Sequence, residues 1–248
     1  MVRVRVLLVG DTHGNIGWLR SVVYPAADLV SADAICQLGD FGFWADDFLK
    51  AARSSPVPFF FLDGNHENHD LLRELVAGSR APFSFGGNLT YLPRGSSLEW
   101  GGVMVGFLGG AVSIDRGYRT AGLDWFAAEA IDEHDLAAAE NLQGCRVLLT
   151  HDAPSGFELP LPPVQDPVWR SQLPACEDHR ERLADVVDRV RPELVVHGHY
   201  HARWDRIVER EWGSYRLRGL SEDGSAPEHH LSVLDCTDGD WSLSDLSR

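Results

Sequence analysis

The sequence is short of lysine and has no basic tract. Lys50 is its only lysine, the other basic side chains are arginines, and the formal net charge of the 248 residues is −15. Binding of long nucleic acid depends on clustered basic side chains that neutralise phosphates. We therefore expect no extended nucleic-acid binding, although arginine remains available for planar, bidentate contacts with a single phosphate group.

Cysteine is also scarce, and long apolar runs are absent. The four cysteines lie far apart and form no C-x-x-C pair: Cys36, Cys145, Cys176 and Cys236. This is too sparse for a disulfide framework, so we expect free thiols in a reducing compartment. The first residues show no signal-peptide pattern, and no apolar run reaches the ~18 residues of a membrane span. We therefore expect a cytoplasmic protein that does not bind membranes.

Three apolar segments in the first part of the chain each end at a polar loop that contains glycine. We expect strands at Val2–Val9, Ala34–Leu38 and Pro58–Leu62, and helices near Ile16–Tyr24 and Asn68–Val76. Strands separated by helices favour parallel pairing in an α/β sheet. In such sheets, ligand sites gather outside the carboxyl ends of the strands.

The rest of the chain predicts further short strands and one long connection. Strands are expected at Leu89–Leu92, Ser97–Trp100 and Val103–Leu108, arranged as a meander, at Arg146–Thr150 and Leu194–Val196, and as antiparallel strands within Trp204–Leu246. Helices are expected at Asp124–Ile131 and Asp178–Val190. The proline-rich segment Ser155–Pro174 is long for a connector and is interpreted as a functional loop or lid. No linker is visible, so we expect a single domain over residues 1–248.

Five of these strands are followed by loops that carry side chains of types that bind metal ions. They are Asp11 and His13, Asp40, Asn65 and His66, His151, and His199 and His201. Carboxylates, imidazoles and an amide oxygen without thiolate suit Mn, Fe, Ni or Zn in an open site better than a closed structural zinc. These ligands are too numerous for one catalytic ion. Asp40, the only acid on its loop, is the natural bridge between two cations about 3.5–4 Å apart.

The order of these motifs resembles that of the calcineurin-like metallophosphoesterase superfamily, in particular its small phage and bacterial members. The motifs that carry the resemblance are Asp11-Thr12-His13, Gly39-Asp40, Gly64-Asn65-His66-Glu67, His151 and Gly198-His199-Tyr200-His201. They extend from residue 11 to residue 201. The resemblance implies an α/β fold that is a four-layer α-β-β-α sandwich of two mixed sheets, with metal ions at the loop ends.

The resemblance also implies a role for each matching residue. Asp11, His13 and His201 would bind one metal ion, Asn65, His151 and His199 would bind the other, and Asp40 would bridge them. Asn65 would also lie beside the substrate. His66 would lie near the leaving group without binding a metal, with Glu67 orienting it.

One segment departs from the family pattern. Many relatives follow the bridging aspartate with an Asp-Arg pair that helps to hold the phosphate, whereas Asp40 is followed here by Phe41-Gly42-Phe43-Trp44. Arg116 and Arg119 are candidate substitutes for that arginine, and surface ion pairs are the alternative interpretation. Trp44 is a candidate for stacking on a nucleobase, and packing below the site is the alternative.

Together these features predict a phosphoesterase that uses two divalent cations, manganese first among them. A hydroxide bridging the cations would attack phosphorus, and His66 would protonate the leaving oxygen. We expect a small phosphodiester or nucleotide as substrate, with cyclic nucleotides among the candidates. The alternatives are a phosphomonoesterase or phosphoprotein phosphatase, and a non-catalytic scaffold of the same fold. The sequence carries no signal for an oligomeric state.

Overall fold

Strand β1 (Arg3–Val9) has buried apolar side chains on both of its faces. Successive side chains of a strand point to opposite faces, so this strand must lie between two apolar layers. In the computed structural model, which describes residues 2–44 and 46–246, Val6 and Leu8 pack into one apolar cluster. Leu7 and Val9 pack into another on the opposite face.

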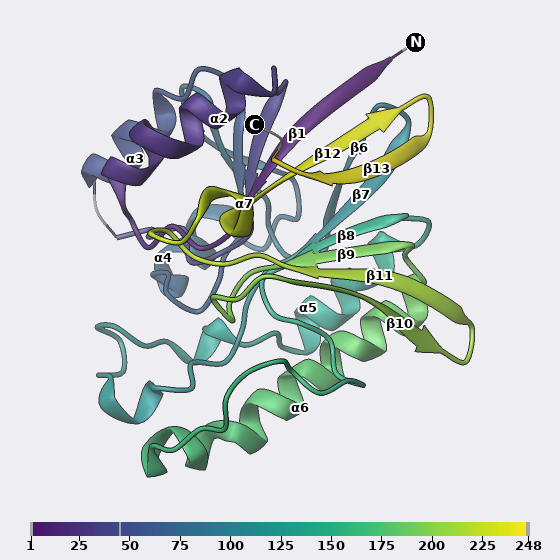
Figure 1. The fold of residues 1–248 in the computed structure, drawn as a ribbon. Helices are drawn as coiled ribbons and strands as arrows, with labels where there is room; N and C mark the ends of the chain where they lie inside the picture. The colour runs from purple at the N-terminus through teal and green to yellow at the C-terminus, as the bar shows by residue number, and fades with distance from the viewer. Residues whose placement is uncertain (1, 45, 247–248) are drawn as a thin grey trace.

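The described strands form two mixed sheets (Figure 1). The first has the order β13-β12-β1-β2-β3-β5-β4, in which β1, β2, β3 and β5 run parallel. Its other strands are β2 (Ala34–Gln37), β3 (Phe59–Phe61), β4 (Phe83–Gly86), β5 (Leu89–Tyr91), β12 (Leu231–Thr237) and β13 (Asp240–Asp245). The second sheet has the order β10-β11-β9-β8-β7-β6. Its strands are β6 (Ser96–Trp100), β7 (Val103–Leu108), β8 (Val147–Thr150), β9 (Leu194–His197), β10 (Trp204–Arg210) and β11 (Gly213–Gly219).

Helices cover the outer face of each sheet, which gives four layers (Figure 1). Apolar residues of α1 (Ile16–Trp18), a π-helical segment (Leu19–Val23), α2 (Tyr24–Leu29), α3 (Asp46–Arg53) and α4 (His69–Val76) pack against the first sheet. Those of α5 (Glu133–Ala138) and α6 (Pro167–Val190) pack against the second. The apolar cluster that contains Val6 and Leu8 fills the space between the two sheets. The predicted α-β-β-α sandwich of two mixed sheets is therefore confirmed.

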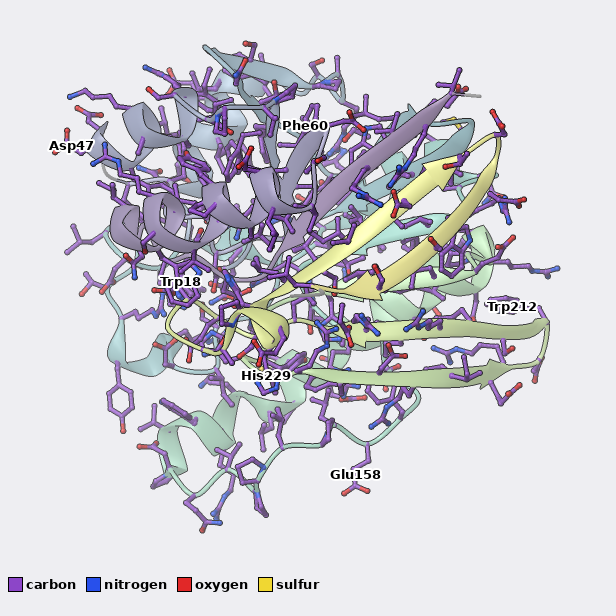
Figure 2. The ribbon with its side chains drawn as sticks, turned by 45° about the horizontal axis from the view of Figure 1, so that its top comes forward. Trp18, Asp47, Phe60, Glu158, Trp212 and His229 are labelled. Carbon is purple, nitrogen blue, oxygen red and sulfur yellow. The ribbon has the colours of Figure 1, made fainter. Side chains whose placement is uncertain are left out.

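The two ends of the second sheet differ in what they carry. In Figure 2, Trp212 marks the β10–β11 turn at one end, and His229 marks α7 (Pro227–His230) at the other. The helix α7 lies in the connection from β11 in the second sheet to β12 in the first. This connection therefore passes close to the carboxyl ends of the central parallel strands.

One strand prediction needs correction. The expected meander does not form, because β5 pairs with β3 and β4 in the first sheet while β6 and β7 belong to the second. The antiparallel strands expected in the C-terminal segment do form, as β10–β11 in the second sheet and β12–β13 in the first. Local alternation identifies a strand, but which sheet it joins depends on contacts remote in sequence.

The helix expected at Asp124–Ile131 is absent from the described residues, where a single 3₁₀ turn covers Ala127–Glu129. The guanidinium of Arg94 donates hydrogen bonds to the carbonyl oxygens of Ala128, Glu129 and Ala130. Phe126 and Ala130, on either side of the turn, have extended backbone conformations, so no α-helix passes through this segment. The segment is irregular, and a buried arginine binds its carbonyl groups.

The segment Ser155–Pro174 is a loop only in its first part, because α6 begins at Pro167. The Asp166 side chain accepts hydrogen bonds from the backbone N–H groups of Val168 and Trp169, which caps this helix. Pro174 lies inside the helix, four residues after the exposed Arg170. Among the described residues, no helix is long and apolar enough to cross a bilayer.

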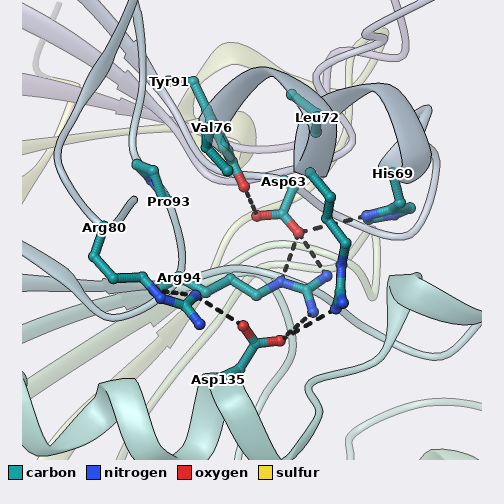
Figure 3. Close-up of a pocket in the computed structure, with 10 residues that line it drawn as sticks. Asp63, His69, Leu72, Val76, Arg80, Tyr91, Pro93, Arg94 and Asp135 are labelled. Carbon is teal, nitrogen blue, oxygen red and sulfur yellow. Dashed lines mark hydrogen bonds and ion pairs between the residues drawn. The ribbon is translucent and has the colours of Figure 1, made fainter. Parts of the chain in front are cut away.

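A buried ion network connects the end of β3 to α5. Arg94 Nε lies 2.8 Å from Asp63 Oδ2, and Arg94 Nη1 lies 2.9 Å from Asp135 Oδ2 (Figure 3). Tyr91 donates a hydrogen bond to Asp63, and Arg80 pairs with Asp135. The network lines a cavity of about 40 Å³ and fixes the start of the loop that follows β3.

We expect Asp135→Asn to lower the free energy of unfolding by about 3 kcal/mol near neutral pH, because Asp63 is then the remaining carboxylate partner of the buried Arg94, and Arg80 loses its ion pair. Burial alone would raise the pKa of Asp135, but the guanidinium groups of Arg94 and Arg80 hold it below its usual value. Its contribution is thus present above the unfolded pKa of about 3.9 and is lost as the pH falls through the lower folded value. Urea unfolding of metal-free protein between about pH 7 and about pH 3 measures this difference.

The exposed Glu140, in the turn that follows α5, provides the control as Glu140→Gln. This variant should unfold like the wild type at every pH. A destabilisation of Asp135→Asn that did not shrink in acid would contradict the assignment to charge.

Candidate metal centre

The loops after β1, β2 and β3 of the first sheet meet those after β8 and β9 of the second. Side chains from four of these loops, those after β1, β2, β8 and β9, form two groups, and within each group one ligand atom per residue lies within 4.8 Å of the others. The groups are Asp11, His13, Asp40 and His201, and Asp40, His151 and His199. Asp40 is common to both, as expected of a residue that bridges two cations.

The two carboxylate oxygens of Asp40 face different imidazoles. Oδ1 lies 3.4 Å from His151 Nε2 and accepts hydrogen bonds from the backbone N–H groups of Asn65 and His66, both at 2.8 Å. Oδ2 lies 3.7 Å from Nε2 of His13 and 3.7 Å from Nε2 of His66. Asp40 therefore presents one oxygen to each half of the site.

The carboxylates of Asp11 and Asp40 are buried, at 0% and 1% exposure, yet their described ion pairs are with histidines and with no Arg or Lys. Burial would raise the pKa of Asp40, but the charges of His151 and His66 lower it well below the usual range. Conversely, burial would lower the pKa of His151, but Asp40 raises it to about 10. Buried carboxylates thus attract positive charge here, and divalent cations would supply it in place of the protons.

This donor set fits divalent cations by its chemistry. It combines carboxylates, imidazoles and the Asn65 amide oxygen and contains no cysteine, which favours Mn, Fe, Ni or Zn in an open site over a closed structural zinc. His151 Nδ1 lies 2.7 Å from the carbonyl oxygen of Leu38 and donates to it. Its Nε2 is thereby left to face Asp40 and, at 3.2 Å, Asn65 Oδ1.

The Asn65 amide is held in one orientation. Its Nδ2 donates to Ser113 Oγ at 3.1 Å, and Ser113 Oγ donates in turn to Glu129 Oε2 at 2.6 Å. Glu129 also accepts from the backbone N–H of Ser113 at 2.8 Å. This buried chain leaves the Asn65 carbonyl oxygen facing the site. Sequence analysis did not identify Ser113 and Glu129 for this role, because neither lies in a recognisable motif.

His66 lies at the edge of the site, outside both groups of candidate ligands. Its side chain is 37% exposed, and Arg119 Nη2 lies 2.8 Å from Nε2 and 2.9 Å from Nδ1. Asp115 fixes Arg119 through contacts of 2.8 Å with Nε and 2.9 Å with Nη2. Trp44, half-exposed, donates from Nε1 to the carbonyl oxygen of His66 at 2.5 Å and packs against Phe126.

Two expected roles are not supported by these contacts. Within the described residues, Arg116 stacks over the ring of Trp125 at 5.7 Å and forms no contact with the candidate ligands. Glu67 was expected to orient His66, but its buried carboxylate accepts instead from the backbone N–H groups of Gly42 and Gly64. Glu67 thus connects the loops after β2 and β3, and burial raises its pKa to about 8.

The backbone is strained where the candidate ligands meet. His13, Asp40, His199 and His201 all have positive φ values, between 44° and 67°, a region that non-glycine residues rarely adopt. Such strain concentrates at functional sites. A Cβ atom at Gly64 would lie 2.1 Å from Asp40 Oδ1, so glycine is required there for the loop to approach the carboxylate.

Comparisons with known proteins identify the family of this chain. The sequence profile described as calcineurin-like phosphoesterase matches residues 4–203. A search of curated proteins finds no match. One solved structure aligns over 99% of this chain and 100% of its own, with a TM-score of 0.63 and 14% sequence identity.

Two further solved structures align with most of this chain. A novel phosphatase from Mycoplasma pneumoniae aligns over 99% of this chain and 94% of its own, with a TM-score of 0.50 and 10% identity, which is a likeness of fold alone. A predicted phosphoesterase from Streptococcus pneumoniae TIGR4 aligns over 99% and 90%, with a TM-score of 0.43 and 11% identity.

Proposed function

This chain belongs to the calcineurin-like phosphoesterase family and is a metal-dependent phosphoester hydrolase, and on that premise we propose that it hydrolyses a small phosphodiester or nucleotide with two divalent cations. The single observation that carries the two-cation proposal is the position of Asp40, which belongs to both groups of candidate ligands. Its Oδ1 faces His151 and its Oδ2 faces His13. Manganese is the cation that we expect first.

The same grouping supports six of the seven assigned ligands, and the seventh, Asn65, has its amide oxygen 3.2 Å from His151 Nε2. Asp11, His13 and His201 would hold one cation and Asn65, His151 and His199 the other, with Asp40 common to both. The cations, when bound, supply positive charge to the phosphoryl oxygens and lower the pKa of a water molecule that serves as nucleophile. Side chains at the edge of the site bind the phosphate group and donate a proton to the leaving oxygen.

Arg119 is the side chain that we assign to phosphate binding in place of the arginine missing after Asp40. The Arg119 side chain is 10% exposed, and Asp115 holds its guanidinium directly beside His66. Guanidinium groups bind phosphate oxygens through paired N–H donors, and a fixed group loses little conformational entropy on binding. His66, partly exposed on the side of Asp40 Oδ2, is placed to donate a proton to the leaving oxygen or to stabilise its charge.

The preference for a small diester or nucleotide rests on the surroundings of His66. Trp44 is 46% exposed beside it and offers an aromatic face to a nucleobase. Arg119, which contacts His66, is carried by the segment after β7, so this segment borders the site. The net charge of −15 disfavours a long polyanionic substrate.

A substrate panel tests this proposal. With Mn²⁺ added to metal-free protein, we expect turnover of cyclic nucleotides or other small diesters to exceed that of simple monoesters and phosphopeptides, and no turnover with chelator. Preference for a phosphopeptide would favour the phosphatase alternative. Metal binding without turnover of any ester would favour the scaffold.

We expect His66→Asn to lower kcat on an unactivated substrate by more than about tenfold, because general acid help contributes about 10²–10⁴-fold. Metal content should not change, since His66 lies outside both ligand groups. The exposed His134 gives the control variant His134→Asn. A loss smaller than tenfold with both cations retained would exclude the acid role.

Arg119 and Arg116 form a matched pair for testing phosphate binding. We expect Arg119→Ala to lower kcat/KM by about 10²-fold, as for a lost charge-assisted contact of about 3 kcal/mol. Arg116→Ala should stay within about threefold of the wild type, because Arg116 stacks on Trp125. Equal losses in steady-state kinetics of the two variants would refute this difference.

A further inference from the structure

We propose that Glu222 and Asp223 are positioning residues that fix the imidazoles of one of the two metal positions, the one formed by Asp11, His13 and His201. This inference rests on the proposed function. The two carboxylates lie between β11 and α7, in the connection that passes from the second sheet to the first. The family profile ends at residue 203, so both lie in a part of the chain that it does not describe.

Each carboxylate contacts the Nδ1 atom of one histidine. Glu222 Oε2 lies 3.0 Å from His201 Nδ1, and Asp223 Oδ1 lies 2.9 Å from His13 Nδ1. The opposite nitrogens face the site, with His201 Nε2 lying 3.2 Å from Asp11 Oδ2 and His13 Nε2 lying 3.7 Å from Asp40 Oδ2. A proton on Nδ1 that is held by a carboxylate leaves Nε2 free to bind a cation and makes it more basic.

The loop that carries these carboxylates is attached to the residues it serves. The backbone N–H of Asp223 donates to the carbonyl oxygen of Asp11 at 2.8 Å, and Glu222 forms a parallel β-bridge with Asp11. Ser221 Oγ donates to the carbonyl oxygen of His201 at 2.8 Å. The two carboxylates therefore keep a fixed position relative to the loops after β1 and β9, which carry the candidate metal ligands.

Helix α7 and the first helical segment add a second attachment. Asn15 Nδ2 donates to Asp223 Oδ2 at 2.6 Å. A further hydrogen bond joins the first helical segment to α7, in which Trp18 Nε1 donates to Nδ1 of His230 at 2.8 Å. Trp18 and His229, the neighbour of His230, are labelled in Figure 2. Since both oxygens of Asp223 are engaged, its carboxylate has one orientation only.

Among the described residues, neither His151 nor His199 of the other metal position forms an ion pair with a carboxylate outside the candidate ligands. His151 Nδ1 donates to the neutral carbonyl oxygen of Leu38 at 2.7 Å. Glu222 and Asp223 therefore act on one position and not on the other. Loss of such outer partners lowers metal affinity by about 10–100-fold.

The test measures Mn²⁺ binding to metal-free protein by titration calorimetry. The wild type should bind two ions, and Asp223→Ala or Glu222→Ala should raise the Kd of one ion by about 10–100-fold without changing the other. Asp223→Asn, which keeps an acceptor for His13 Nδ1 but not the charge, should fall between. Glu228→Gln removes a charge from the exposed face of α7 and should match the wild type.

The Tm of the metal-free proteins separates positioning from a merely structural role. We expect the variants to melt within about 2 °C of the wild type without metal and to gain less stability from Mn²⁺. Unchanged Kd values, or equal weakening of both ions together with a lower metal-free Tm, would overturn the inference. Because Glu222, Asp223 and His13 also lie close enough to share a cation, a stoichiometry that falls from three to two would overturn it as well. A wild type that binds no Mn²⁺ would instead refute the proposed function.

Discussion

The burial of the Asp40 carboxylate is the constraint around which the rest of the site is arranged. A buried negative charge needs compensation, and among the described residues Asp40 pairs only with imidazoles. Two backbone N–H groups of the loop after β3 also point at its Oδ1. The charge of Asp40 thus determines where the histidines lie and how closely the loops approach.

This arrangement requires a rigid support, which the two sheets and their buried polar contacts provide. The left-handed backbone at Asp40 and His199 is unfavourable and persists only because neighbouring structure fixes it. The Asp63–Arg94–Asp135 network fixes the start of the loop after β3, and Glu67 joins that loop to the one after β2. Buried ionic groups outside the reactive centre therefore serve its geometry.

The sequence predicted well those features that depend on neighbouring residues. Strand β1 is an apolar run that stops at a polar loop, and the residues of that loop, Asp11 and His13, could be singled out by type and spacing. Glu222 and Ser113 could not, because their partners lie far along the chain and an isolated acid or serine has no distinctive pattern.

The two incorrect helix predictions also involve contacts that the local sequence pattern does not reveal. The helix expected at Asp124–Ile131 is absent, and the carbonyl groups of this segment accept hydrogen bonds from Arg94, more than thirty residues earlier. The start of α6 was missed because the segment before it is rich in proline, although Asp166 caps the helix. In both cases a side-chain contact accompanies a backbone conformation that local propensity did not predict.

The position of the ligands between the two sheets has a mechanical consequence. Asp11, His13 and Asp40 follow strands of the first sheet, and His201 follows a strand of the second. The other group likewise joins Asp40 to His151 and His199 across the same boundary. Each cation would thus cross-link the two sheets. Metal binding would then be thermodynamically linked to the association of the two halves of the sandwich.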